Sequence, residues 1–96
     1  MASRITIYGT KGDKDTERLR REMRVLSMNY NFEDIKKNPA AIVRLAEQTD
    51  GSSVYPKVEV ELSETDGFVV LANPDASTLR RTLFSESVFG ITSYWI

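Results

Sequence analysis

The residues able to do chemistry in this sequence gather where a first helix is expected to begin. Asp13, Lys14, Asp15 and Thr16 follow a loop that runs from Gly9 to Gly12. A carboxylate at a helix start is stabilised by the free N–H groups there and by the helix dipole. Asp13 or Asp15 is therefore expected to be an N-cap, which typically stabilises a helix by about 1 kcal/mol. The alternative is that the Asp13 carboxylate permanently mimics a bound anion or a thiolate at this place.

Composition excludes most other chemistry. The 96 residues include no Cys and no His, which excludes disulfides, thiolate nucleophiles and the usual zinc sites. The formal net charge of −1 gives no global field that favours nucleic acid or an anionic membrane. No apolar run approaches the roughly 20 residues of a membrane span, and no signal-peptide h-region follows the first residues. We expect one soluble cytoplasmic domain that holds no metal and no cofactor.

Two further clusters of charge are candidate sites. Carboxylates gather on a predicted hairpin, but they lack the EF-hand spacing that binds a cation. Arginines gather on two predicted helices, but they do not share one face and no aromatic residues are interleaved with them. We therefore expect a solvated acidic surface and a salt-bridged basic surface, with neither a metal nor nucleic acid bound. The acidic set is Glu59, Glu61, Glu64 and Asp66, and the basic set is Arg18, Arg20, Arg21, Arg24, Arg80 and Arg81.

Hydrophobic periodicity predicts the elements that position these residues, in the order β-α-β-α-β-β-α. Strands are predicted at residues 5–8, 30–35, 54–62 and 68–71. Helices are predicted at about residues 15–28, 39–49 and 74–83, and the last two open with Asn-Pro as cap and first helical residue. This order favours one mixed four-stranded sheet with helices on both of its faces. The inward residues are expected to be Leu19, Met23, Leu26, Ala41, Ile42, Leu45, Ala46, Thr49, Val58, Val60, Leu62, Leu79 and Leu83.

Three landmarks between Arg4 and Leu83 together resemble a glutaredoxin. The first is the strand at residues 5–8, followed by a loop of the right length before the helix. The second is Val54-Tyr55-Pro56, which is similar to the threonine-valine-proline turn of that family. The third is Asn73-Pro74-Asp75 after the last strand, which looks most like the mycoredoxin-type members. The resemblance implies an α/β thioredoxin fold and a cis peptide bond before Pro56.

The motif that defines the chemistry of this family is missing. Glutaredoxins carry Cys-x-x-Cys at the mouth of the first helix, and the corresponding positions here are Asp13, Lys14, Asp15 and Thr16. Thiol–disulfide exchange needs a thiolate to attack a sulfur. We therefore expect that the protein has no thiol–disulfide oxidoreductase activity and is not an enzyme of this kind. Thr16 takes the place of the second cysteine, where its hydroxyl is expected to bond to nearby backbone.

The resemblance also implies a groove for a thiol ligand. Its parts in the family are a basic residue beside the motif, the backbone at the cis-proline turn and the start of the last helix. Asp75 would add negative charge where an anionic ligand needs donors, and Tyr55 is bulkier than the valine usual there. The corresponding residues are Lys11 or Lys14, Tyr55, Pro56, Asn73 and Asp75.

Residues 85–96 lie beyond the expected end of such a domain, which divides the chain into a domain of residues 1–84 and an aromatic-rich tail of residues 85–96. The tail holds the only Trp of the chain and one charged side chain, Glu86. It either folds back onto its own domain or docks on a protein partner through Phe89, Tyr94 and Trp95.

The function expected from these observations is a redox-inactive protein-interaction module or a small accessory subunit of a larger assembly. The alternative is a binding domain for a low-molecular-weight thiol, such as glutathione or mycothiol, that works without a catalytic cysteine.

Overall fold

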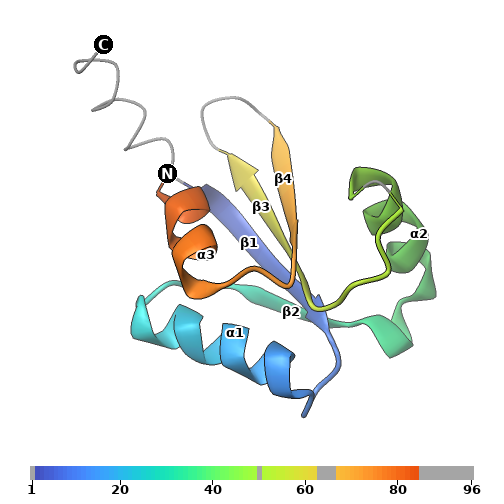
Figure 1. The fold of residues 1–96 in the computed structure, drawn as a ribbon, viewed down its shortest axis with the longest axis horizontal. Coiled ribbons are helices and arrows are strands. Elements are labelled where there is room, and N and C mark those ends of the chain that lie inside the picture. The colour runs from blue at the N-terminus through green and yellow to red at the C-terminus, as the bar shows by residue number, and fades with distance from the viewer. Residues whose placement is uncertain (1, 50, 63–66, 85–96) are drawn as a thin grey trace.

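The computed structural model of the protein describes residues 2–49, 51–62 and 67–84. Its order of elements confirms the predicted β-α-β-α-β-β-α sequence, with one short 3-10 helix η1 (Ile35–Lys37) added after the second strand (Figure 1). The strands are β1 (Ala2–Gly9), β2 (Asn31–Asp34), β3 (Lys57–Leu62) and β4 (Phe68–Ala72). The helices are α1 (Lys14–Val25), α2 (Pro39–Gln48) and α3 (Ala76–Leu83).

The four strands form one mixed sheet, as the sequence predicted, and their order in it is β2-β1-β3-β4. β1 pairs with β2 in parallel and with β3 antiparallel, and β3 pairs antiparallel with β4. The parallel pairing of β1 with β2 starts only at Thr6 and Asn31. The first residues of β1 therefore pair with β3 on one side, while β2 has not yet begun on the other.

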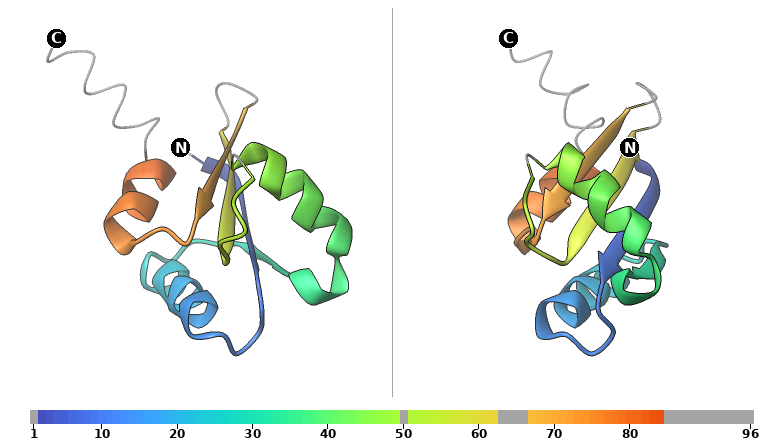
Figure 2. Two further views of the ribbon diagram at one scale, coloured as in Figure 1. Left: turned by 45° about the vertical axis from the view of Figure 1, so that its right-hand side comes forward. Right: turned by 90° about the vertical axis from the view of Figure 1, so that its right-hand side faces the viewer.

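Helices cover both faces of this sheet: α1 and α3 pack on one face and α2 on the other (Figures 1 and 2). Successive strand residues point to opposite faces, so Ile7 lies under α1 and α3 while its neighbour Tyr8 lies under α2. The first layer forms the larger core, and its fully buried helix residues are Leu19, Met23, Leu79 and Leu83. Periodicity predicted all four of these helix residues as inward.

Helix α2 corrects one prediction about the core. Ile42 was predicted to face inward, but 41% of its surface is exposed. The buried residues of this helix are Ala41 and Leu45. A helix turns about 100° per residue, so the stripe set by Ala41 and Leu45 carries Ile42 away from the sheet.

The first Asn-Pro pair starts α2 where predicted, with Pro39 as its first residue, whereas the second pair does not start α3. Asn38 occupies the N-cap position of α2, but its side chain makes no capping hydrogen bond. The N-cap of α3 is Asp75, not Asn73, and the Asp75 carboxylate accepts a hydrogen bond of 2.7 Å from the backbone N–H of Thr78. Asn73 has φ of +41°, whereas an N-cap normally has extended backbone. The sequence signal was therefore two residues early for α3.

Two other predicted elements are shorter in the structure. The strand predicted from Val54 begins only at Lys57, because Val54 to Pro56 form a loop, and α1 ends at Val25 rather than near Met28. Within the described ranges, no helix has the length and apolar character needed to cross a membrane.

Candidate functional site

The positions implied by the resemblance meet at one end of the sheet, where β1 ends and α1 begins (Figure 1). Gly9, the last residue of β1, lies against the side chains of Thr16 and Pro56. The backbone N–H of Asn73 donates a 2.7 Å hydrogen bond to the carbonyl oxygen of Pro56. Three segments far apart in the sequence therefore converge on this corner, which we call the α1 mouth.

Asp13 caps helix α1, which confirms the N-cap prediction. It has the extended backbone of an N-cap, with φ of −65° and ψ of 138°. Its Oδ2 accepts a 3.0 Å hydrogen bond from the Thr16 N–H and a 3.1 Å hydrogen bond from the Thr16 hydroxyl. One carboxylate oxygen thus satisfies a free N–H of the first turn and also fixes the side chain of Thr16.

Thr16 is buried beneath the loop that precedes it. Only 1% of its surface is exposed, and its Oγ1 accepts a 3.4 Å hydrogen bond from the backbone N–H of Thr10. The hydroxyl therefore bonds to nearby backbone, as predicted, and it also donates to Asp13. The position that holds the second cysteine in the resembled family is occupied here by an internally bonded hydroxyl.

Gly9 allows this close packing because it has no side chain. A Cβ placed on Gly9 would lie 2.9 Å from Thr16 Cγ2 and 3.2 Å from Pro56 Cβ, and it would collide with Thr16 Oγ1. Such distances are shorter than ordinary carbon–carbon contacts of about 3.5–4.0 Å. The α1 mouth is therefore closed between the end of β1 and the proline loop, without room for one additional methyl group.

The Tyr55–Pro56 peptide bond is cis, which confirms the expectation drawn from the resemblance. Pro56 is buried, and its carbonyl oxygen accepts the hydrogen bond from the Asn73 N–H. The turn before β3 is thereby joined to the turn after β4.

Arg18 ties α1 to the loop before α3, and sequence reasoning missed this role. Its Nη2 donates to Asn73 Oδ1 at 2.8 Å and to the carbonyl oxygen of Pro74 at 3.1 Å. Its Nε also lies 3.7 Å from Asp15 Oδ1. The spacing of Asp15 and Arg18 indicated an ordinary pair on the helix surface. No sequence signal linked Arg18 to an asparagine 55 positions away.

Two aspartates occupy the helix starts that would face an anionic ligand. Asp13 caps α1, and Asp75 caps α3. Hydrogen bonds from Thr78 hold the pKa of Asp75 below its usual value, with smaller contributions from Arg81 and Arg18. Asp75 therefore keeps its negative charge at neutral pH. Lys11 and Lys14, the two cations expected in the groove, both have exposed side chains.

Lys57 is fully buried, although alternation had only placed it on the polar side of β3. Its Nζ donates to the carbonyl oxygen of Ser52 at 2.6 Å and to Thr49 Oγ1 at 2.9 Å. It also lies 4.8 Å from the centre of the Tyr55 ring, a distance at which a cation is attracted to an aromatic face. Burial lowers the pKa of Lys57.

The groove residue Tyr55 lies in the same cluster. Burial raises the pKa of Tyr55. Its buried hydroxyl has no hydrogen-bond partner within the described part of the chain. Tyr55, which is bulkier than the valine usual at this position in the resembled family, thus lies over the buried side chain of Lys57.

The basic cluster has surface ion pairs, as predicted, whereas Glu59 of the acidic cluster is not solvated: its side chain is 13% exposed and lies 2.7 Å from Arg44. Arg20 pairs with Glu17 at 3.2 Å, and Arg80 pairs with Glu22 at 2.7 Å. No group of three or more acidic residues in residues 2–49, 51–62 and 67–84 is placed to hold a metal ion. The acidic hairpin residues Glu64 and Asp66 lie outside that part, as do the expected partner contacts Phe89, Tyr94 and Trp95.

Neither the family models nor the curated protein sequences contain a match to this chain. The sequence and the structure show a small α/β domain that has no cysteine and one mixed four-stranded sheet. The resemblance to glutaredoxins rests on the landmarks, on the order of elements and on the cis turn.

Proposed function

We propose that this chain is a glutaredoxin-like domain of thioredoxin fold that carries out no redox chemistry and acts as a protein-interaction module or small accessory subunit. The order of elements, the strand order β2-β1-β3-β4 and the cis bond before Pro56 support the fold. Fold alone does not give function, so the functional part of the proposal is argued from the α1 mouth.

The closed α1 mouth is the observation that carries the proposal. Thr16 is buried and its hydroxyl is bonded on both sides, while Asp13 is used to cap the helix. The chain has no thiol, and exchange chemistry requires an accessible thiolate. Every interaction found at this place stabilises the domain itself. The scaffold is therefore maintained by contacts that serve no reaction, as expected of a domain kept for binding.

The partner contact is proposed for the tail, through Phe89, Tyr94 and Trp95. The large exposed apolar side chains of the described domain are spread over α1, α2, the loop before β3 and β4, and scattered exposed apolar residues are normal on any protein surface. The tail instead concentrates aromatic residues, which are enriched at protein–protein interfaces. The exposed apolar residues of the domain are Val25, Ile42, Val43, Val54 and Phe68.

Capture from an extract of the native cells tests this proposal with full-length variants. The immobilised baits are the natural chain, a tail variant in which Phe89, Tyr94 and Trp95 are all changed to Ser, and a groove variant, Lys11→Glu with Lys14→Glu. The proposal predicts one partner that the natural chain and the groove variant retain and the tail variant loses. Circular dichroism confirms that all three baits are folded. Loss of the partner from the groove variant alone would refute the tail as the contact.

The second candidate is a binding domain for glutathione or mycothiol. The cis turn at Pro56 and the exposed cations Lys11 and Lys14 favour it. It ranks second because Asp13 and Asp75 already cap the two helix starts that would receive an anionic ligand, and each places a negative charge there.

A further inference from the structure

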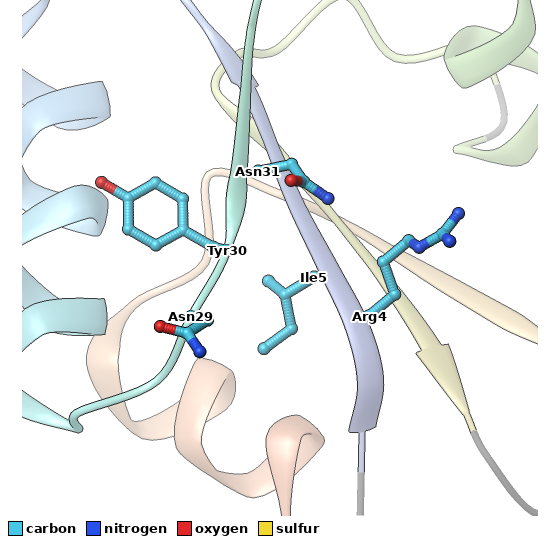
Figure 3. A pocket seen from close by; sticks show the side chains of 5 residues that line it. All are labelled: Arg4, Ile5, Asn29, Tyr30 and Asn31. Atoms are coloured by element: carbon cyan, nitrogen blue, oxygen red, sulfur yellow. The ribbon is translucent and has the colours of Figure 1, made fainter.

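A hollow of about 230 Å³ lies at the other end of β1, far from the α1 mouth. Pairing between β1 and β2 begins at Thr6 and Asn31, and the hollow opens where the two chain segments part before that point. Figure 3 shows the Ile5 side chain in this gap, with Asn29 on one side and Arg4 on the other. The lining residues are Arg4, Ile5, Asn29, Tyr30 and Asn31.

The size and lining of the hollow suit one amphipathic side chain. Sites for drug-sized molecules usually measure roughly 300–1,000 Å³, so this hollow is too small for most of them. Ile5, which is 4% exposed, and the half-buried Tyr30 supply apolar surface. Asn29, Asn31 and Arg4 are exposed at its rim. The hollow therefore combines an apolar floor with the amide groups of Asn29 and Asn31 at its opening.

The described part of the chain ends at Phe84, on the core that also underlies the hollow. Phe84 packs against the buried cluster that contains Ile5, and Tyr30 packs against the same cluster. Leu83, the last residue of α3, belongs to that cluster together with Ile5 of β1. Residue 95 is eleven positions further on, and an extended chain covers up to about 3.3 Å per residue, or about 36 Å. The tail is thus long enough to return to the hollow.

We propose that Trp95 of this chain occupies the hollow between β1 and the segment before β2. Trp combines a large apolar ring with one N–H donor that seeks a partner when buried, and Asn29 or Asn31 offers an amide oxygen to it. The Arg4 side chain points away from Ile5 in Figure 3, and its Nε lies 3.8 Å from Glu61 Oε2, so the two asparagines supply the polar groups for the ring N–H.

Occupancy of the hollow has a consequence for partner binding. A partner that binds Trp95 must first draw it out, so the internal contact and the external contact exclude each other. This consequence rests on the proposed function, whereas the occupancy itself does not. A measurement on the purified chain without any partner therefore tests the occupancy separately from the function.

Fluorescence of Trp95, the only tryptophan of the chain, tests the occupancy in the natural full-length protein. The constant for quenching by acrylamide is measured for the folded protein and for the same protein in urea. We expect quenching of the folded protein to be several-fold weaker, at every protein concentration. Equal quenching in both states would overturn the proposal. Shielding that disappears on dilution would also overturn it, because a second copy would then cover Trp95.

Variants of the hollow identify where Trp95 is shielded. Asn29→Arg with Asn31→Arg blocks the opening, and we expect it to raise quenching to the level seen in urea. Arg4→Ala, which shortens one lining side chain and also removes its pairing with Glu61, serves as a milder second variant and is expected to raise quenching partway. The matched control is Gln48→Arg, an exposed amide at the end of α2, which should leave quenching unchanged. Unchanged quenching in both hollow variants would show that Trp95 is buried elsewhere and would overturn the assignment.

Discussion

At its C-terminal end, strand β1 runs into a corner where polar groups bond to one another within the chain, whereas at its N-terminal end the sheet opens into a hollow rimmed by exposed polar side chains. Asp13, Thr16 and Thr10 are linked by hydrogen bonds at the first end. At the second end, Asn29 and Asn31 lie exposed around Ile5. The difference is that side-chain hydrogen bonds within the chain fill the first end, whereas the second end keeps exposed polar side chains around a hollow.

The largest effect is expected from Gly9→Ala at the closed end. The new methyl group would collide with Thr16 Oγ1 and crowd Pro56, and overpacking of this kind typically costs about 1–3 kcal/mol. Urea unfolding measures the loss of stability. The double variant Gly9→Ala with Thr16→Ala removes the colliding atoms and should lose less than the sum of the two single changes. If the two losses of unfolding free energy add exactly, the contact with Thr16 is not what destabilises the Gly9→Ala variant.

The next effect is expected from removing the cap of α1. Asp13→Ala should lower the free energy of unfolding by about 1 kcal/mol, because the Thr16 N–H and the Thr16 hydroxyl both lose their acceptor. Thermal or urea unfolding provides the measurement. Asp13→Ser retains a capping oxygen and should recover most of the loss. Lys14→Ala, one residue away and exposed, should change stability by less than about 0.5 kcal/mol.

A pH effect is expected from Lys57, which lies directly after the cis turn. Burial lowers its pKa in the folded protein, so between that pKa and the unfolded value of about 10.4 the unfolded chain binds the additional proton. Stability therefore rises with pH in this window, by at most about 1.4 kcal/mol per pH unit for one proton.

Comparison with Lys57→Met isolates this contribution. Tyr8 and Tyr55 have raised pKa values, so their share of stability falls at alkaline pH, and both proteins contain it. The difference in unfolding free energy between the natural chain and Lys57→Met should grow in favour of the natural chain as the pH rises. A difference that stays constant with pH would mean that the lysine ammonium is not penalised by burial.

The smallest effect is expected at the open end. Asn31→Ala changes an exposed side chain at the rim of the hollow, so the free energy of unfolding should change by less than about 0.5 kcal/mol. The same urea titration measures it. A loss as large as that of Asp13→Ala would remove the contrast between the two ends of β1.

Hydrophobic spacing and capping residues in the sequence predicted the buried faces of α1 and α3 and the start of α1. The spacing of Leu19 and Met23, and of Leu79 and Leu83, marked the buried helix faces correctly, because amphipathic periodicity reflects burial directly. The N-cap Asp13 and the cis bond before Pro56 were also predicted. These features depend on neighbours within a few positions or on a recognisable turn.

The missed features depend on contacts and backbone conformations that hydrophobic periodicity does not encode. The bonds of Arg18 to Asn73 join residues 55 positions apart. Lys57 is buried because the loop that contains Ser52 folds over it, which alternation along β3 does not reveal. The shift of the α3 cap from Asn73 to Asp75 follows from the left-handed backbone at Asn73. Tertiary packing overrode the local signal in each case.

One titration tests most directly whether the closed end has lost ligand binding as well as chemistry. Reduced glutathione is added to the ¹⁵N-labelled full-length protein, and amide shifts are followed by NMR. The account predicts no saturable shifts at the α1 mouth, because the helix starts there are capped by Asp13 and Asp75. Saturable shifts of the amides of Lys11 to Thr16, Tyr55 and Asn73 to Asp75 would contradict it and establish a retained thiol site.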